Sequence, residues 1–474
     1  MSDIETQGLA APDGAGRLNG LYFAAWRWHF YAGLYVVPFL IMLCLTGIVM
    51  VWFSAINAEY GERLTVVPTP QRQSLAQLQA TAVALHPGGV AGQFIAPYTP
   101  ENPVLFRVDL PEGARMIALD PYSGAVLRNT LNGDTWEEWA DQLHGELLQT
   151  GPRKPVGDLL VEIAASLALL LVVTGMYLAW PRGGKGLRDM LVPDFGQSGR
   201  VFWKSLHRSI GAWVSIVLVM FLLTGLSWAG IWGGKFVQAW NTFPAEKWDA
   251  VPLSDVTHAS LNTTPKAVVP WTLEQTPMPA SGSDAGVAGV PVGKVVDLDS
   301  VVALAGQIGF AGRFQLAYPS GETGVWTISQ DSMSNDSHNP MADRTVHVDR
   351  YTGKILAEVG FADYSLAGKA MAMGVPLHMG LTGLWNAVFN ILFCVAVIAV
   401  CISGGVMWWL RRPEGQIRLA APPRPAAVPF SKGAVLVVLA LSLLFPVLGL
   451  TLLAALTLDL VVLGAVPLLR RVFS

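Results

Sequence analysis

Four long apolar stretches constrain this chain more than any other feature of its sequence. A helix needs about 20 residues to cross the hydrocarbon core of a bilayer, which is about 30 Å thick. Apolar stretches of this length occupy residues 30–53, 159–180, 210–232 and 387–410. Only 14% of the residues are charged, against about 25% in an average soluble domain. The sequence therefore predicts an α-helical integral membrane bundle.

The last apolar stretch, residues 434–469, is too long for one span and has basic residues at both ends. A hairpin of two short spans that turns near residues 446–449 predicts six spans, with both termini in the cytoplasm. One long tilted helix, and hence five spans, is the alternative. The positive-inside rule supplies the orientation, because Lys and Arg precede the first span, fill the second connection and follow the fourth span.

Net charge and cysteine content exclude several classes of function. The net charge of −3 provides no basic field for nucleic acid. Cys44, Cys394 and Cys401 all lie in apolar stretches, so they build neither a disulfide framework nor a Cys-x-x-Cys metal site. Any metal chemistry must therefore rest on histidine.

The two long connections, residues 57–142 and 236–370, carry more acid than base and are expected to be exported. Alternating apolar patterns at 103–110, 116–127, 325–330 and 344–356 are typical of strands joined by tight turns. Each connection should form a small α+β domain. Residues 265–293 are rich in Pro, Gly, Ser and Ala, which predicts a flexible linker.

An internal repeat relates the two halves of the chain. The pattern H-x3-G-x12-T-G begins at His29 and again at His207. The exported segments contain DPYSG and DRYTG, and a Leu-His pair follows each of them, ending at His144 and His378. The next spans end alike, with Thr174-Gly175 and Ser403-Gly404 each five residues before a tryptophan. The architecture is therefore a duplicated unit of span, exported domain and span, which predicts a pseudo-two-fold axis along the membrane normal.

The four repeated histidines lie at the mouths of apolar spans. His29 and His207 begin spans on the cytoplasmic side, whereas His144 and His378 precede spans that start outside. Two histidines on each membrane face match two bis-histidine b-type haems stacked across the bilayer, because imidazole is a good axial ligand for haem iron. A single boundary histidine is usually an interfacial anchor, and intramembrane histidines also relay protons. Repetition in register favours haem.

Glycines and arginines near these histidines extend the haem hypothesis. Gly33 and Gly211 lie one helical turn beyond their histidines, where a side chain would obstruct a flat macrocycle. Gly47 and Gly225 lie 18 residues beyond the same histidines, five turns and about 27 Å along the helix, and should face the second haem. Helix packing is the other interpretation of these glycines. The residues expected to bind haem propionates are Arg27 and Arg208, although the positive-inside rule also explains them.

The other four histidines, His86, His258, His338 and His347, are expected to be surface or structural residues. Together these patterns divide the chain into ten segments: a disordered cytoplasmic tail 1–20, the first span 21–56, an exported domain 57–142, a His-bearing segment with the second span 143–181, a cytoplasmic loop 182–204, the third span 205–235, an exported domain 236–370, a His-bearing segment with the fourth span 371–411, a cytoplasmic loop 412–431, and a C-terminal hairpin 432–470.

From about residue 20 to its C-terminus the chain resembles the PepSY-associated transmembrane helix proteins of bacterial inner membranes. The segments that carry the resemblance are HFYAGLYVVPFLIMLCLTG, LHGELL, FWKSLHRSIGAW, VPWTLEQTPMP, VHVDRYTGKIL and PLHMGLTGLWN. The resemblance implies two periplasmic PepSY-like domains, in which DPYSG and DRYTG are turns. It also implies a di-haem ferric-siderophore reductase, with His29 and His207 on the cytoplasmic-side iron and His144 and His378 on the periplasmic-side iron.

Such a reductase would need no acid–base residue, because electrons would leave by outer-sphere transfer through haem. The chain has no G-x-G-x-x-G fingerprint after a strand, so its donor should be a membrane quinol or a cytoplasmic reductase. The loop residues Trp326, Tyr318 and Arg313 are candidates for contact with the siderophore. Two alternatives are a haem-free siderophore or metal transporter, and a membrane-anchored regulator whose PepSY-like domains bind peptides or proteases.

Overall fold

The computed structural model describes residues 15–184, 186–262, 269–412, 419–423, 431–459 and 461. The chain divides into two compact units. The helical unit comprises residues 1–42, 160–226 and 395–474, and the sheet unit comprises residues 43–159 and 227–394. Most of the tail expected at 1–20 lies outside the described residues, but residues 15–20 are helical rather than disordered, because extending an existing helix costs much less than nucleating one.

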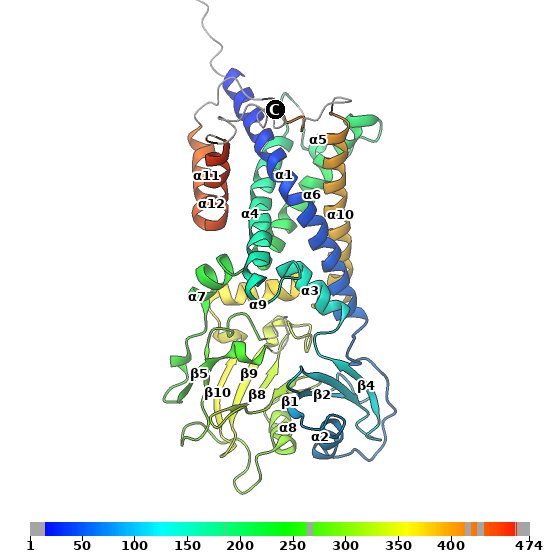
Figure 1. Cartoon of the computed structure of the whole chain (residues 1–474), viewed down its shortest axis with the longest axis vertical. Coiled ribbons are helices and arrows are strands. Elements are labelled where there is room, and N and C mark those ends of the chain that lie inside the picture. The colour runs from blue at the N-terminus through cyan, green and yellow to red at the C-terminus, as the bar shows by residue number, and fades with distance from the viewer. Residues whose placement is uncertain are drawn as a thin grey trace, which may run out of the picture. The chain divides into compact units, whose positions relative to one another are not determined.

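Four helices are long and apolar enough to cross a membrane among the residues described. They are labelled in Figure 1 as α1 (Ala15–Val51), α4 (Lys154–Ala179), α6 (Gly199–Leu226) and α10 (Leu384–Trp409). A short π-helix, Trp52–Ile56, continues α1. The third apolar stretch was expected to be helical to residue 232, but α6 ends at Leu226, and a separate π-helical turn, Trp232–Val237, follows. The prediction of four long apolar helices is confirmed.

The C-terminal apolar stretch forms a helical hairpin in its described part. Helix α11 (Lys432–Leu444) packs against α12 (Pro446–Leu458), and the extended backbone of Phe445 separates them. Proline is favoured in the first turn of a helix because it lacks the N–H that would have no partner there. The alternative of one long helix is therefore wrong. Each helix has 13 residues, fewer than the about 20 of a full span, so the count of six spans stays a prediction.

The two long connections form one antiparallel sheet of eight strands in the sheet unit, in the order β10-β9-β8-β7-β1-β2-β3-β4. Its strands are β1 (Val90–Ile95), β2 (Val104–Asp109), β3 (Arg115–Leu119), β4 (Val126–Leu131), β7 (Gln315–Ala317), β8 (Val325–Gln330), β9 (Arg344–Asp349) and β10 (Ile355–Gly360). All of the strand patterns named above fall in this sheet. The two connections were expected as separate small domains, yet β1 pairs with β7, with Phe94 opposite Leu316. This pairing satisfies two strand edges that separate domains would leave exposed.

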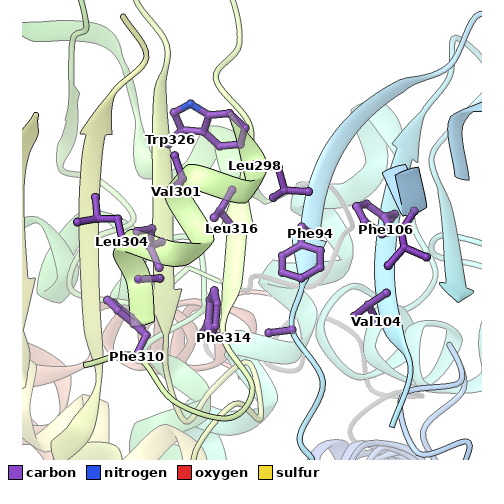
Figure 2. Close-up of a cluster of buried hydrophobic side chains, with 14 of the residues drawn as sticks. Phe94, Val104, Phe106, Leu298, Val301, Leu304, Phe310, Phe314, Leu316 and Trp326 are labelled. Carbon is purple, nitrogen blue, oxygen red and sulfur yellow. The ribbon is translucent and has the colours of Figure 1, made fainter. Parts of the chain in front are cut away.

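A shared hydrophobic core lies between this sheet and two short helices, α2 (Leu75–Ala84) and α8 (Leu298–Gln307). Figure 2 shows Leu298, Val301 and Leu304 of α8 together with Phe94 and Phe106 of the first half. Side chains of both halves are thus buried in one cluster. Asp299 of α8 also accepts hydrogen bonds from the first two backbone N–H groups of α2, where a helix needs an acceptor.

The DPYSG and DRYTG motifs form equivalent turns, as the repeat predicts. The carboxylate of Asp120 accepts a hydrogen bond from the backbone N–H of Tyr122 at 2.9 Å, and Asp349 accepts one from Tyr351 at 2.8 Å. The closing glycines, Gly124 and Gly353, have φ of 76° and 69°, in the left-handed region that glycine adopts without strain. These turns connect β3 to β4 and β9 to β10.

The described part of the expected flexible linker, residues 269–293, packs into the sheet unit. Trp271, Leu273, Met278 and Val290 are all buried. Strand β6 (Pro277–Pro279) pairs with β5 (Leu253–Thr257). The expectation of a flexible segment is wrong here, because these apolar side chains anchor a Pro- and Gly-rich backbone that forms little regular structure of its own.

Replacing Phe106 by Ala should destabilise the sheet unit by about 3–5 kcal/mol, the usual cost of deleting a buried phenylalanine ring. Phe106 is fully buried and its ring centre lies 5.3 Å from that of Phe94. Denaturant unfolding of the purified full chain measures the effect. Val90→Ala, at a position 67% exposed on β1, is the matched control and should change stability little. Equal effects of the two variants would contradict a shared core at this site.

Candidate functional site

Two of the four repeated histidines meet in the helical unit. The rings of His29 in α1 and His207 in α6 have their centres 6.2 Å apart and their planes at 89°. The Nδ1 atom of His207 lies 3.0 Å from the carbonyl oxygen of Val400 and 3.1 Å from Oγ of Ser403. A carbonyl oxygen only accepts hydrogen bonds, so the proton of this ring is on Nδ1. The Nε2 lone pair of His207 is thereby available to a ligand.

The same tautomer follows for His29. Its Nδ1 atom lies 3.0 Å from Oγ1 of Thr174. The hydroxyl of Thr174 donates its only hydrogen to the Leu170 carbonyl at 2.7 Å, so its oxygen must accept from the histidine. The helix backbone therefore determines the direction of the bond, and the Nε2 lone pair of His29 is also available.

Small residues next to these hydroxyls make room for the imidazole rings. A Cβ atom added to Gly175 would lie 3.0 Å from Cε1 of His29, and one added to Gly404 would lie 3.3 Å from Cε1 of His207. Both distances are tighter than ordinary van der Waals contact. The Thr174-Gly175 and Ser403-Gly404 repeat thus positions the two histidines. The hydroxyl accepts a hydrogen bond from Nδ1, and the absence of a side chain on the glycine leaves room for the ring.

The other two repeated histidines meet in the sheet unit. His144 lies near the end of α3 (Trp136–Glu146) and His378 near the end of α9 (Leu366–Met379). Their ring centres are 6.4 Å apart and their planes meet at 71°. Nδ1 of His144 lies 2.8 Å from Oγ1 of Thr46, whose hydrogen is donated to the Leu43 carbonyl at 3.1 Å.

Both members of this pair are therefore on short helices that precede the spans. The tautomer of His144 is the same as in the first pair, with its proton on Nδ1. Burial lowers the pKa of His144 to about 4, which keeps its imidazole neutral at physiological pH.

The separation of each pair suits one metal ion between two imidazoles. Two metal–nitrogen bonds of about 2.0 Å, with each nitrogen about 1 Å from its ring centre, place the centres about 6 Å apart. By contrast, His258 and His347 are bonded directly, with ring centres 4.9 Å apart and Nε2 atoms 3.0 Å apart. That second kind of pair leaves no room for an ion and is structural, as expected.

A two-histidine donor set also limits which metal group fits. No group of three His, Cys, Asp or Glu side chains able to hold a metal ion occurs in the described part of the chain. An ion held by two imidazoles therefore has its remaining ligand positions open to another group. A porphyrin supplies four such nitrogens in a plane, which leaves two axial positions for histidine.

Two of the four predicted glycines, Gly33 and Gly211, border open space. A Cβ atom added to Gly33 or Gly211 would meet nothing within 4 Å, and one added to Gly47 would meet only Sγ of Cys394 at 3.9 Å. Gly225 lies in the last turns of α6. The open space beside Gly33 and Gly211, one turn from the first histidine pair, fits the haem hypothesis.

The two predicted arginines differ in their surroundings. Arg27 donates hydrogen bonds to the Tyr31 hydroxyl at 3.0 Å and to the Pro422 carbonyl. The Nε atom of Arg208 is buried and has no hydrogen-bond partner among the described residues. Arg208 therefore has an N–H donor available for a ligand, whereas both terminal nitrogens of Arg27 already donate hydrogen bonds within the protein.

The family model of the PepSY-associated TM region matches residues 26–411. The chain belongs to the PepSY-associated transmembrane family. Together with its four long apolar helices, this makes it a multi-pass membrane protein. A search of curated proteins finds no match.

A buried polar loop supports His378 in this PepSY-associated protein. Residues 331–343 connect β8 to β9, and the amide of Asn335 donates to the Ser54 carbonyl at 3.1 Å. His338 bonds through Nδ1 to the Leu381 carbonyl at 2.8 Å, in the turn after α9. The loop thus joins the end of the first span helix to the turn that follows His378.

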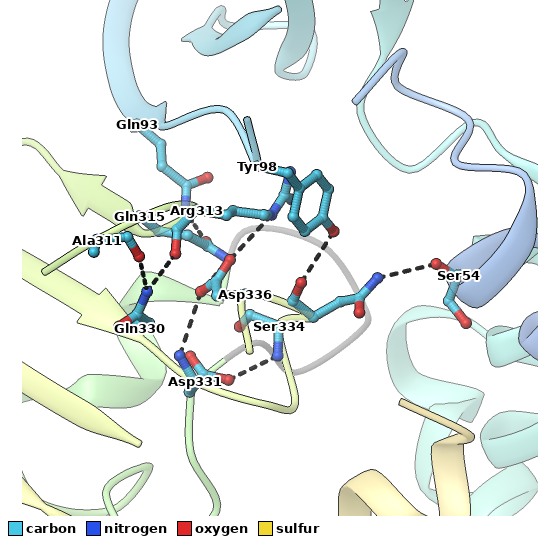
Figure 3. A network of polar contacts seen from close by, with 11 residues as sticks. Ser54, Gln93, Tyr98, Ala311, Arg313, Gln315, Gln330, Asp331, Ser334 and Asp336 are labelled. Atoms are coloured by element: carbon cyan, nitrogen blue, oxygen red, sulfur yellow. Dashed lines mark hydrogen bonds and ion pairs between the residues drawn. The ribbon is translucent and has the colours of Figure 1, made fainter. Parts of the chain in front are cut away.

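Within this loop, acidic side chains are packed closely together (Figure 3). Asp336 pairs with Arg313 at 3.1 Å and bonds to the Gln315 amide. Asp331 and Asp343 are buried nearby. Burial raises the pKa of Asp343 to about 7 and that of Asp336 to about 6. Arg313, a candidate for substrate contact, is therefore occupied by a structural ion pair.

A cavity of about 720 Å³ lies over the other face of the sheet from the hydrophobic core. Tyr318, Thr327 and Thr345 line it, as does the ion pair of Arg107 with Asp109. The hydroxyl of Thr345 is buried without a hydrogen-bond partner among the described residues. Of the three loop candidates, Tyr318 lines this cavity, whereas Trp326 belongs to the hydrophobic core.

Replacing Asp343 by Asn should weaken the pH dependence of stability. A carboxyl whose pKa is raised on folding stabilises the protein when protonated, and this contribution is lost as pH rises through the folded-state pKa. For Asp343, the loss falls between about pH 4 and pH 8. Unfolding free energies of wild type and variant at pH 5 and pH 8 measure the effect. Asp284→Asn, at an exposed carboxylate, is the control, and an unchanged pH dependence in Asp343→Asn would contradict the assignment.

Proposed function

We propose that this protein is a di-haem b electron-transfer protein of the bacterial inner membrane that reduces ferric siderophores on the periplasmic side. The observation that carries the proposal is the pair of ring separations, 6.2 Å for His29 with His207 and 6.4 Å for His144 with His378. The two histidines of each pair would hold one haem iron. When bound, haem supplies reversible one-electron iron chemistry at each pair.

The protein's own contribution is to orient and tune the ligands. Hydrogen bonds from Nδ1 to Thr174, Ser403 and Thr46 hold three of the rings and leave the Nε2 atom of each without the proton. Such bonds also raise the basicity of the ligating nitrogen. Apolar surroundings favour the less charged ferrous state and so help determine the reduction potential.

The proposed reaction transfers one electron to each ferric ion, leaving ferrous iron and the intact siderophore. Hard oxygen ligands suit ferric iron and hold the ferrous ion less well, so reduction releases the metal. No side chain transfers a proton in this scheme. The electrons would come from a quinol or a cytoplasmic reductase, and the N-terminus would be cytoplasmic.

For the substrate, we propose the cavity on the sheet unit. Its volume of about 720 Å³ is in the usual range for small-molecule sites, about 300–1,000 Å³. The unpaired Thr345 hydroxyl supports this choice, because buried polar groups in proteins usually have partners.

Haem content of the detergent-purified protein tests the central claim. We expect two b-type haems per chain in the absorption spectrum. His29→Ala and His207→Ala should each remove the same haem, and His144→Ala and His378→Ala should each remove the other. A folded but colourless wild-type preparation would refute the proposal and leave the transporter and regulator alternatives.

Two glycine variants provide a matched control for this experiment. Gly33→Leu should displace the haem of the His29 pair, because its side chain would enter the open space beside the ligands. Gly405→Leu adds the same side chain at an exposed position with equally open surroundings, and should leave both haems in place. Equal haem contents in the two variants would contradict the clearance role of Gly33.

Oxidation of the pre-reduced protein by a ferric siderophore tests the substrate site. Thr345→Val removes the unpaired hydroxyl at nearly constant volume and should raise the KM for the ferric siderophore up to about tenfold, the equivalent of one hydrogen bond. The absorption spectra and kcat should be unchanged. A colorimetric chelator that binds ferrous iron measures the rate of reduction. The exposed Thr69→Val is the control. Unaltered KM in Thr345→Val would remove the cavity from the proposal.

A further inference from the structure

Three arginines of the helical unit have buried guanidinium nitrogens that lack partners among the described residues. The atoms are Nε of Arg208, Nε and Nη2 of Arg411, and Nε of Arg412. A buried charged donor without an acceptor is costly. An anionic group outside the described residues is therefore expected to bind there.

Arg411 contacts the helix that carries His29. Its guanidinium carbon is 5.2 Å from the ring centre of Trp26 and 5.1 Å from that of Phe30, both in α1. His29 is three residues beyond Trp26, and residues with this spacing share one face of a helix. Along the chain, Arg411 lies seven residues beyond Gly404, where an added Cβ would be 3.3 Å from Cε1 of His207.

The charges around Arg411 are of the wrong sign to neutralise it. Burial, together with the nearby Arg200, lowers the pKa of Arg411. No carboxylate of the described residues forms an ion pair with Arg411 or Arg208. Among the described residues, no anionic side chain neutralises these two guanidinium groups.

Arg412 faces a different environment. Its guanidinium lies over Trp408 and Trp409 at 5.3 Å from each ring centre, and Trp409 is 65% exposed. This position suits a lipid headgroup at the membrane boundary. Arg411 is therefore the arginine that distinguishes the histidine site.

We propose that Arg411, with Arg208, binds the carboxylates of the cofactor held by His29 and His207. This inference rests on the proposed function. A guanidinium presents two parallel N–H donors that match a carboxylate or phosphate. The same anion chemistry is available from a phospholipid headgroup, so the test separates the two sources. Arg411 replaces Arg27 in the predicted set, because Arg27 already bonds to Tyr31 and Pro422.

The midpoint potentials of the two haems in the detergent-purified full chain test this assignment. Arg411→Gln should lower one potential by about 59 mV, a tenfold change for one electron, because unneutralised carboxylates stabilise ferric iron. The shifted potential should belong to the haem that is absent from His29→Ala, and the other should not move. Arg411→Lys keeps the charge and should shift the same potential less.

Arg182→Gln is the matched control. This guanidinium already donates to the Tyr177 carbonyl at 2.7 Å, so both potentials should stay unchanged. Bound phospholipid phosphorus is measured in the same preparations.

Two haems with unmoved potentials in Arg411→Gln would overturn the inference and leave the proposed function standing. Loss of bound phospholipid with unmoved potentials would assign the anion to a lipid headgroup, which also overturns it. A haem-free wild type would refute the proposed function itself. If Arg411→Gln cannot be purified, Arg208→Gln is the second variant, and an unmoved potential there would be equally decisive.

Discussion

The candidate site depends on one hydrogen-bonding arrangement, in which a helix backbone determines the proton position of a histidine. Thr174 and Thr46 donate their hydroxyl hydrogens to carbonyls three or four residues earlier, and their oxygens then accept from Nδ1 of His29 and His144. Ser403 does the same for His207. A hydroxyl has one hydrogen to donate, so the imidazole must supply the next one. The Nε2 lone pairs are available as a result.

The sheet unit also reflects the internal duplication, because both halves of the repeat contribute to one sheet. Each long connection contributes a helix and four strands to the shared core and sheet, and neither half closes its own sheet edge. Pairing of β1 with β7 joins the halves, and the core is made of side chains from both. The short helices that carry His144 and His378 belong to this same unit. Their pairing is thus supported by a structure that the two halves build together.

Several features of the protein are locally unfavourable and concentrate around the histidine pairs. The carboxyls of Asp331, Asp336 and Asp343 are buried together in the loop that bonds to the turn after His378. In the helical unit, Arg208, which follows His207 in the sequence, and Arg411, which contacts Trp26 and Phe30 of α1, have buried N–H groups without a hydrogen-bond partner among the described residues. Proteins usually break the rules of polar satisfaction where function requires it. These departures therefore support the placement of function at the two pairs, independently of the histidines themselves.

Much of this arrangement was predictable from the repeated sequence. The apolar stretches predict the four long helices, and the H-x3-G-x12-T-G repeat predicts which histidines are equivalent. The Thr-Gly and Ser-Gly pairs were visible as part of that repeat, but their role as Nδ1 acceptors was not, since it depends on contact between different helices. Nothing in the sequence indicated that Arg411 has a role beyond the positive-inside rule. The prediction of a flexible linker at 265–293 was wrong in its described part, because composition does not show which apolar side chains become buried in a core.

The sequence by itself determined the membrane class, the duplication, the turns and the four histidines, because each follows from local periodicity or from spacing along one chain. The sequence also predicted that His29 pairs with His207 and His144 with His378, but only the tertiary structure gave the separations of their ring centres, 6.2 Å and 6.4 Å, which suit one metal ion. It also decided that the two long connections share one sheet. Both results depend on contacts between residues far apart in the chain, whose geometry is determined by packing and edge pairing rather than by local pattern.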